Sequence, residues 1–330
     1  MTLQRTWALV LAAGDGSRLA MLTADAQGQS VPKQFCSLNG GHSLLEDAMQ
    51  RGRCVVPRER LCVIVAENHR RFWRRALSAL PASNVIVQPR NCGTANGILL
   101  AALSILERDP LARIVFLPAD HYVRDEGALA DSLRETATLL TRNPSGLALL
   151  GIHPEEADPE LGYIVPGATL ADGTRNVQRF VEKPDSALAH QLLASGALWN
   201  SFIFAANGPA LLSMMRERMS HIVEEMATAL ARDARMDVGP AALRSLYDNL
   251  PSIDFSRSIL QGAEGELRVI AAPACGWSDL GTPRRVLETL RRLEETRLDR
   301  GAPTRGARSF VTAPAFIDLA AQRARLELVG

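Results

Sequence analysis

The stretch that decides the fold is Trp7-Ala8-Leu9-Val10-Leu11-Ala12-Ala13-Gly14-Asp15-Gly16-Ser17-Arg18-Leu19, followed by Pro32-Lys33-Gln34-Phe35. An apolar run that leads directly into two glycines indicates a buried strand ending in a loop that can hold phosphate. Glycine permits this because it lets backbone N–H groups approach anionic oxygens. Arg18 adds a planar guanidinium and Lys33 a compact ammonium group, so that both can meet one polyphosphate. A loop at this edge of a parallel sheet lies where open α/β folds bind their ligands.

Neither of the two common nucleotide-binding loops fits this stretch. Leu19 stands where the dinucleotide fingerprint requires its third glycine, and residues 33–36 include no acidic residue. The sequence also has no Gly-Lys-Ser or Gly-Lys-Thr that could open a helix as a P-loop does. The remaining alternative is an ordinary strand-to-helix turn, in which glycine and serine are common.

The composition is that of a globular protein, with 47% hydrophobic and 22% charged residues over 330 positions. A formal net charge of +1 gives no reason to expect nucleic acid or an anionic membrane as a partner. The five cysteines are scattered and odd in number, which argues against a zinc site and against a secreted disulfide scaffold. No leader precedes the first strand and no apolar run reaches about 18 residues, so we expect a reduced, cytoplasmic protein.

Short apolar strands alternate with helical periodicity in the first half, which predicts an α/β fold with a doubly wound, mostly parallel sheet. The expected strands there are 7–12, 61–66, 84–87, 113–117 and 147–152, and the expected helices are about 43–53, 68–80, 94–108 and 126–142. After about residue 155, strands at 162–165 and 177–182 around a turn at 171–174 indicate a mixed β insertion. The remaining expected elements are helices at about 186–195, 207–232, 239–248 and 282–297, a strand at 266–272, and a short tail with strand-like pieces at 309–312 and 325–329.

Two aspartates stand at boundaries between loops and helices. Asp120 follows the strand 113–117 in Leu117-Pro118-Ala119-Asp120-His121, and Asp279 lies in Gly276-Trp277-Ser278-Asp279-Leu280-Gly281. A carboxylate at the end of a strand can ligate Mg²⁺, which prefers few carboxylates together with phosphate oxygens and water. The alternative for each is a helix-capping role. Spacing alone does not bring the two to one ion.

The pattern Gly-x-Gly-x-Arg-Leu followed by Pro-Lys-Gln resembles the signature of the sugar-1-phosphate nucleotidyltransferases. With Phe35 included, it looks most like that of the mannose-1-phosphate guanylyltransferases. Further segments resemble the family's motifs in the same order: Gln88–Gly97, Leu117–His121, Gly162–Ile164, Phe180–Pro184, Leu198–Phe204, Ser252–Phe255 and Gly276–Pro283. The resemblance covers about residues 7–290. It implies a Rossmann-like, GT-A-like catalytic domain at 1–298, with the β insertion serving the sugar and a short extension at 299–330.

The resemblance implies transfer of a nucleotidyl group from an NTP, most of all GTP, to a sugar 1-phosphate, most of all mannose 1-phosphate. The implied catalytic residues are Arg18, Lys33, Asp120 and Lys183. The implied nucleotide-binding residues are Ala12, Ala13, Gly14, Gly16, Ser17, Arg18, Lys33, Gln88, Asn91, Thr94 and Ala95. The implied sugar-binding residues are Gly162, Tyr163, Glu182, Lys183, Asn200 and Asp254, and Asp120 and Asp279 would bind Mg²⁺. Because a phosphate monoester is already ionised near neutral pH, His121 is interpreted as an orienting partner and not as a base.

The sequence departs from the family's pattern in several places. Asp15 brings a negative charge close to the phosphates, Asn96 replaces an expected proline, and fourteen residues separate Arg18 from Lys33. The 20–32 segment is interpreted as a flap, and the extension as a surface for a homodimer. Two alternatives stay open. One is the same chemistry on another pair, such as glucose 1-phosphate with UTP or dTTP. The other is a catalytically idle subunit that binds nucleotide sugars.

Overall fold

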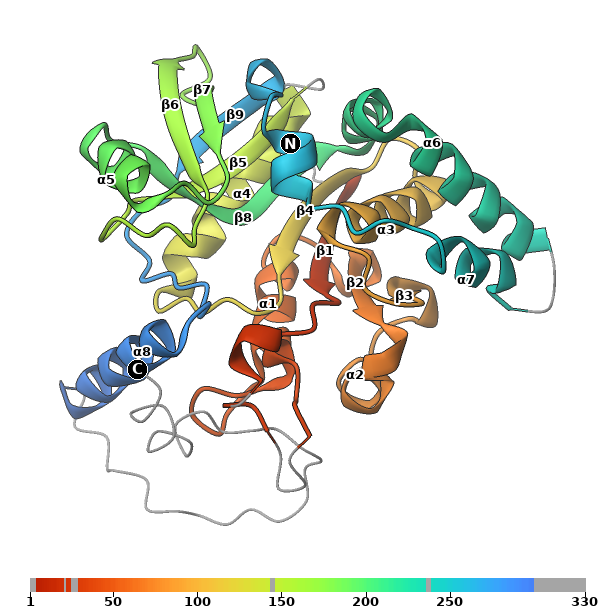
Figure 1. Ribbon diagram of the computed structural model, residues 1–330, viewed down its shortest axis with the longest axis horizontal. Helices are drawn as coiled ribbons and strands as arrows, with labels where there is room; N and C mark the ends of the chain where they lie inside the picture. Colours follow the sequence, from red (N-terminus) through yellow and green to blue (C-terminus); the bar gives the residue numbers. More distant parts are fainter. Residues whose placement is uncertain (1–3, 21, 25–28, 143–145, 236–238, 300–330) are drawn as a thin grey trace.

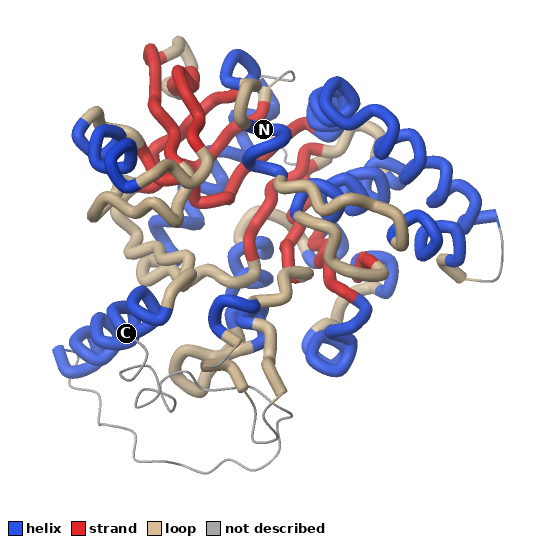
Figure 2. Tube along the Cα trace, viewed as in Figure 1, coloured by secondary structure: helices blue, strands red, loops and turns tan. Residues whose placement is uncertain are grey.

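A nine-stranded sheet runs through the described part of the protein in the order β3-β2-β1-β4-β8-β5-β9-β7-β6 (Figures 1 and 2). The computed structural model describes residues 4–20, 22–24, 29–142, 146–235 and 239–299. Almost all of the expected extension at 299–330, with its two strand-like pieces, therefore lies outside the described residues, as does part of the expected flap at 20–32.

The first four strands pair in parallel. They are β1 (Thr6–Ala12), β2 (Leu61–Ala66), β3 (Val85–Gln88) and β4 (Arg113–Pro118). β1, β2 and β4 are buried almost throughout on both faces, which explains why they read as continuous apolar runs, whereas β3 at the edge of the sheet alternates between buried and half-buried residues. The helices that connect them and follow them are α1 (Leu44–Arg53), α2 (Arg70–Ala76), α3 (Thr94–Arg108) and α4 (Glu126–Arg142). Each of these elements was expected from the sequence within a few residues.

The second half of the sheet is mixed. β8 (Leu198–Asn207) runs antiparallel between β4 and β5 (Leu147–Ile152), and β9 (Leu267–Ala271) is parallel to β5. β6 (Tyr163–Thr169) and β7 (Arg175–Val181) form the hairpin of the expected insertion. All strands except β7 and β8 point in the same direction, so the prediction of a mostly parallel sheet is confirmed. No strand was expected at 198–207, where the sequence pattern indicated only a motif.

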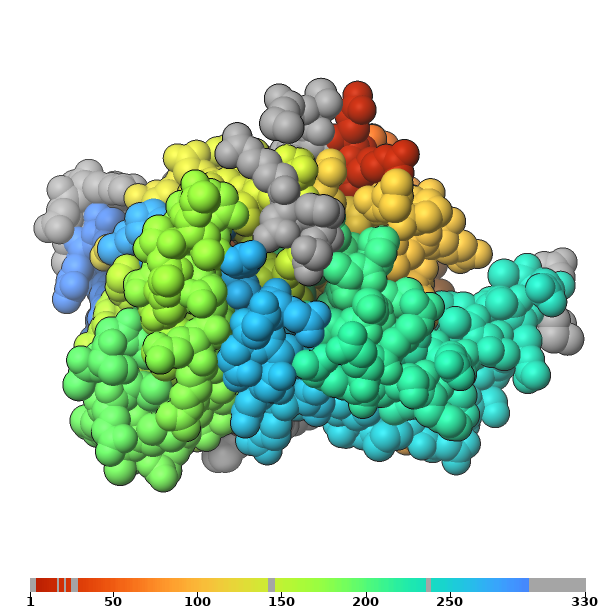
Figure 3. All heavy atoms as spheres, turned by 90° about the horizontal axis from the view of Figure 1, so that it is seen from above, coloured from red at the N-terminus to blue at the C-terminus, as the bar shows by residue number. Residues whose placement is uncertain are grey.

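Helices cover both faces of the sheet, as a doubly wound fold requires. The second half adds α5 (Ser186–Ala194), α6 (Gly208–Arg235), α7 (Ala241–Tyr247) and α8 (Pro283–Asp299). One core packs α1, α4, α5 and α8 against the sheet face that carries Val10, and the other packs α3, α6 and α7 against the face that carries Leu9. In Figure 3, the segment around β9 lies between the β6–β7 hairpin and α6. Within the described ranges, no helix combines the length and apolar character that crossing a bilayer requires.

Candidate active site

The turn at residues 33–35 fixes the backbone of the loop that follows β1. The side-chain amide of Gln34 donates to the carbonyl oxygens of Ala12, at 3.0 Å, and Gly14, at 2.8 Å. Gly16 has a φ of +64°, and a Cβ there would lie 2.9 Å from the backbone nitrogen of Lys33, so only glycine fits. Gln34 was not among the expected site residues, although its place in Pro-Lys-Gln carried that signal. Its amide fixes the backbone of this loop through both hydrogen bonds.

A cavity of about 330 Å³ opens at the carboxyl ends of the parallel strands. Many of the residues expected at the nucleotide line it: Ala13, Gly14, Gly16, Gln88, Asn91 and Thr94, joined by Asp120 and Asp254. Ala12 and Ala95 are buried and do not belong to this lining, and of Ser17 the structure describes only the backbone. A Cβ added to Gly14 would meet no described atom within 4 Å, so a ligand can approach this backbone closely.

Gln88, Asn91 and Thr94 differ in whether their side chains already form hydrogen bonds within the protein. Among the described residues, the side-chain oxygen of Gln88 is buried and has no hydrogen-bond partner, although the residue belongs to the lining of the cavity. Asn91 accepts from the Gly93 N–H at 3.0 Å and donates to Asp15 at 2.9 Å. The hydroxyl of Thr94 accepts from the Phe255 N–H at 2.8 Å. Asn91 and Thr94 therefore hold the wall of the cavity in place through their side chains, while the buried oxygen of Gln88 keeps an unused acceptor.

A second cavity, of about 220 Å³, shares Gly16 and Asp120 with the first and is also lined by Arg18 and Lys33. The buried ammonium of Lys33 lies 3.0 Å from Asp120 Oδ2, and it donates to the carbonyl oxygens of Asp279, at 2.6 Å, and Leu280, at 3.3 Å. Arg18 is half exposed and lies 3.3 Å from the Glu160 carboxylate. The fold thus brings three of the four expected catalytic residues to one space, which is bordered by backbone N–H groups and has room for phosphate.

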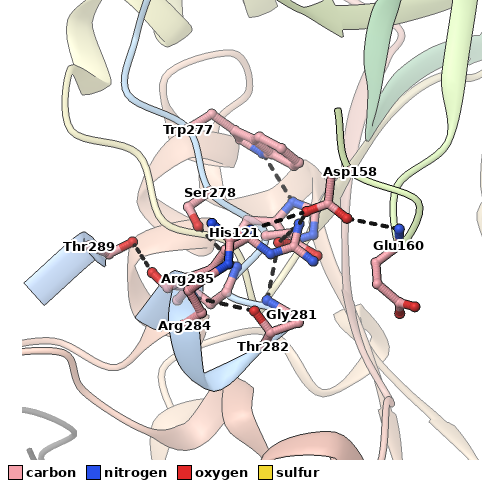
Figure 4. Close-up of polar contacts among 12 residues, drawn as sticks. His121, Asp158, Glu160, Trp277, Ser278, Gly281, Thr282, Arg284, Arg285 and Thr289 are labelled. Carbon is pink, nitrogen blue, oxygen red and sulfur yellow. Dashed lines mark hydrogen bonds and ion pairs between the residues drawn. The ribbon is translucent and has the colours of Figure 1, made fainter. Parts of the chain in front are cut away.

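The charges around Asp120 are arranged to keep its carboxylate ionised. Burial is the largest single influence and opposes ionisation, but the charges of Lys33 and His121 and the hydrogen bonds to the carboxylate together outweigh it, so the pKa of Asp120 lies below its usual value. Burial lowers the pKa of His121 to about 4, so the imidazole is neutral at pH 7. Trp277 donates to His121 Nδ1 at 3.3 Å (Figure 4), which leaves the proton on Nε2, 3.6 Å from Asp120 Oδ1. The neutral His121 thus lies beside the Asp120 carboxylate, and its role as an orienting partner stays a prediction.

The carboxylates of the two expected magnesium ligands have different ion-pair partners in this structure. The carboxylate of Asp279 lies 2.9 Å from Arg285 Nη1 and accepts from the Gly281 N–H, and the same guanidinium nitrogen lies 3.2 Å from Asp158 (Figure 4). The described residues contain no group of three or more His, Cys, Asp or Glu suited to a metal. Asp120 fits Mg²⁺ as one carboxylate beside the second cavity. Asp279 stays a predicted ligand, because both carboxylates are paired with cations in this structure, Asp120 with Lys33 and Asp279 with Arg285.

Several residues expected at the sugar also lie together. A Cβ on Gly162 would lie 2.6 Å from the Glu182 carboxylate and 3.3 Å from Asn200 Cβ. Burial, and then the charge of Asp254, raise the pKa of Glu182 to about 7 against the opposing charge of Lys183. Asn200 is already committed, since its oxygen accepts from the Phe202 N–H at 3.1 Å. Gly162, Glu182 and Asn200 therefore lie side by side, and Asp254 is near enough for its charge to act on Glu182.

Tyr163 corrects the expectation for this cluster. Its ring is fully buried, and its hydroxyl bonds both backbone groups of Asp158, accepting from the N–H at 2.8 Å and donating to the carbonyl oxygen at 3.2 Å. The side chain therefore packs in the core and does not face the site. Phe202, an aromatic residue of the motif at 198–204, was not among the expected site residues, yet it lines the first cavity.

The comparisons with known proteins agree with this geometry. The family model for nucleotidyl transferases matches residues 7–296. The chain is 30% identical over 285 residues to the xanthan biosynthesis protein XanB of Xanthomonas campestris pv. campestris, covering 83% of this chain and 57% of that protein. It is 28% identical over 282 residues to a mannose-1-phosphate guanylyltransferase of Salmonella muenchen, with the same coverage. The chain thus spans little more than half the length of these curated relatives.

A crystal structure from Thermus thermophilus, described as a mannose-1-phosphate geranyltransferase, superposes with a TM-score of 0.74 at 30% sequence identity. The match covers 87% of this chain and 79% of that one. Sequence and fold therefore point to the same group of proteins.

Proposed function

The chain belongs to the nucleotidyl transferase family, and on that premise we propose that it converts GTP and mannose 1-phosphate to GDP-mannose and pyrophosphate. The observation that carries the proposal is the pair of connected cavities at the carboxyl ends of the strands. One is lined by residues expected at the nucleotide, and the other gathers Arg18, Lys33 and Asp120. The choice of GTP and mannose 1-phosphate rests on the printed name of the Salmonella relative and on the Pro-Lys-Gln-Phe motif.

The proposed chemistry is a single in-line displacement. An oxygen of the sugar phosphate attacks the α-phosphorus of the nucleotide, the new P–O bond forms, and the bond to pyrophosphate breaks on the opposite side. No base is needed, because the attacking phosphate is already ionised near neutral pH. Catalysis then consists of positioning and of neutralising charge on the phosphoryl oxygens.

Each residue at the second cavity would serve this displacement through its charge. The backbone at Gly14 and Gly16 would hold the polyphosphate, and Arg18 would exchange Glu160 for the departing pyrophosphate. Lys33 would neutralise charge that grows at the α-phosphate, and Lys183 would hold the sugar phosphate. Asp120 would hold Mg²⁺, which supplies further positive charge to the phosphate oxygens when bound. Glu182, beside Gly162, would accept from hydroxyls of the sugar.

The test is pyrophosphate release by the purified protein with Mg²⁺, for GTP, ATP, UTP, CTP and dTTP, each with mannose, glucose or N-acetylglucosamine 1-phosphate. Release confined to GTP with mannose 1-phosphate is the expected result. Release with another pair would keep the chemistry and replace the substrates. No release with any pair, while nucleotide still binds, would instead indicate an idle subunit that binds nucleotide sugars.

A further inference from the structure

The antiparallel strand β8 is interrupted beside the first cavity. Asn200 lies opposite Gly151 of β5, and Phe204 lies opposite Leu149, so residues 201–203 face the single residue Leu150. Such a bulge removes ladder partners from the backbone and changes the direction of a side chain.

Two side chains of the same strand replace the lost partners. The hydroxyl of Ser201 donates to the Leu150 carbonyl oxygen at 2.5 Å and accepts from the Ile203 N–H at 3.1 Å. The Asn200 oxygen accepts from the Phe202 N–H at 3.1 Å. The side chains of Asn200 and Ser201 therefore form hydrogen bonds with backbone groups that the bulge leaves without ladder partners. This accounts for two polar residues within the strand.

Phe202, at the middle of the bulge, has a φ of +56°. This left-handed region is unfavourable for a bulky residue by about 1–2 kcal/mol, whereas glycine adopts it freely. Strained backbone conformations cluster at functional sites, so a large side chain that such a backbone holds beside a cavity is a candidate for a function.

The ring of Phe202 is fixed on its inner side and faces the cavity on the other. It packs edge-on against Phe204 and Phe255, with centroids 6.0 Å and 6.1 Å away, and these two buried rings stack on each other at 5.2 Å. Phe202 itself is half-buried and lines the first cavity beside Ser252 and Asp254. Asp254 is one of the residues expected at the sugar, and its charge acts on Glu182, so this part of the lining adjoins the expected sugar site. The N–H of Phe202 is held by Asn200, which packs against Gly162.

We propose that Phe202 is a specificity-determining residue whose ring forms the apolar wall for the sugar of the sugar 1-phosphate. This inference rests on the proposed function, and it names what selects among hexoses in that site. The polar residues around Gly162 would hold the hydroxyls of one face of the sugar, while a rigid aromatic surface fits an apolar C–H face and rejects a sugar of another shape.

The kinetic test compares Phe202→Gly with wild type on the three sugar 1-phosphates at saturating nucleotide. Glycine keeps the backbone conformation and removes the wall. We expect KM for the preferred sugar phosphate to rise about tenfold and the preference among the three sugars to fall by a similar factor, with KM for the nucleotide changed less than about twofold. Unchanged sugar preference, or a change confined to the nucleotide, would overturn the proposal.

The matched control is Trp7→Leu, which removes a buried aromatic of the same core near the start of β1. We expect it to lower the melting temperature and to leave the sugar preference as in wild type. An equal loss of preference in this control would mean that loosening the core, and not the loss of the wall, changes selectivity, and would overturn the proposal.

The melting temperature gives a second readout that does not depend on activity. Because φ is positive, we expect Phe202→Gly to melt at a higher temperature than Phe202→Ala, the reverse of the usual order in a strand. The opposite order would remove the strain on which the proposal stands. Wild-type protein without turnover on any substrate pair would overturn the proposed function, whereas the melting order would still test the bulge.

Discussion

The first half of the sheet (residues 6–142) and the second half (residues 147–271) build their sides of the site in different ways. In the first half, parallel strands end at one edge, and the residues that line the cavities follow these ends directly, as Gly14 follows β1 and Asp120 follows β4. In the second half, β8 enters from the opposite direction and delivers Phe202 from its middle, by a bulge. A residue that follows the end of a strand reaches the cavity from a loop. A residue in the middle of a strand does so only at a bulge, where other groups must replace the lost backbone hydrogen bonds.

The largest expected effect concerns the ion pair between Asp120, which follows β4, and Lys33 of the turn at 33–35. We expect Asp120→Asn and Lys33→Met each to lower kcat about 100- to 1,000-fold, because charge stabilisation at the phosphates is lost. The double variant should be little worse than either single one, since the two groups act as a unit. Pyrophosphate release with Mg²⁺ and the melting temperature measure activity and folding separately.

The matched control for that pair is Arg5→Ala, which breaks the exposed pair with Asp109 near the starts of β1 and β4. We expect kcat to stay within about twofold of wild type, because an exposed pair far from the cavities contributes little. Near wild-type turnover in Asp120→Asn would contradict the mechanism for the whole first half.

The next effect concerns the contact between the first half and the segment 252–255. Gly93 has a φ of +85°, and a Cβ there would lie 2.3 Å from the Ile253 carbonyl oxygen. We expect Gly93→Ala to lower the free energy of unfolding by about 2–4 kcal/mol and to weaken nucleotide binding, because the backbone of the cavity wall must move. Urea unfolding and nucleotide titration provide the measurements.

Gly173→Ala is the matched control, since Gly173 has a φ of +84° and no described atom lies within 4 Å of its added Cβ. We expect it to cost about 1 kcal/mol, from backbone conformation alone, with nucleotide binding unchanged. Equal losses of the free energy of unfolding in the two variants would show that the close approach between position 93 and Ile253 does not contribute to the effect.

The bulge of the second half predicts an intermediate effect. Ser201→Ala leaves the Ile203 N–H and the Leu150 carbonyl oxygen without the hydroxyl that joins them, so we expect a loss of about 1–3 kcal/mol in the free energy of unfolding. Ser104→Ala in α3 removes only a hydroxyl bonded to the Leu100 carbonyl oxygen, and should change stability by less than about 0.5 kcal/mol. Similar losses in the two variants would argue against side-chain support of the bulge.

The smallest effect is a pH dependence from Glu182. The folded carboxyl has a pKa of about 7 against an ordinary value of 4.5, so the folded state holds its proton more tightly. Its stabilising contribution is full below about pH 4.5 and is lost as the pH rises through 7. Urea unfolding at several pH values should therefore show Glu182→Gln gaining on wild type by about 1 kcal/mol between pH 5 and pH 8. A constant difference would contradict the shifted pKa.

Prediction from sequence worked best where one segment decides its own structure. The apolar runs predicted β1 to β5 because a strand buried on both faces is apolar throughout. The strand β8 went unrecognised because its centre holds Asn200 and Ser201, and their reason lies in a bulge against β5. Gln34 was overlooked for a similar cause, since its two partners lie about twenty residues earlier in the chain.

The sequence by itself determined the doubly wound class, the glycine-containing loop after β1 with its required Gly16, and the place of Asp120 just after β4, because these depend on local backbone and burial. The tertiary structure alone decided which charges meet. It paired Asp279 with Arg285, it turned the Tyr163 hydroxyl into the core, and it aimed Phe202 at the cavity. The physical reason is that a charge or a ring acts over a few ångströms, and such distances between residues far apart in the chain are determined only when the sheet is assembled.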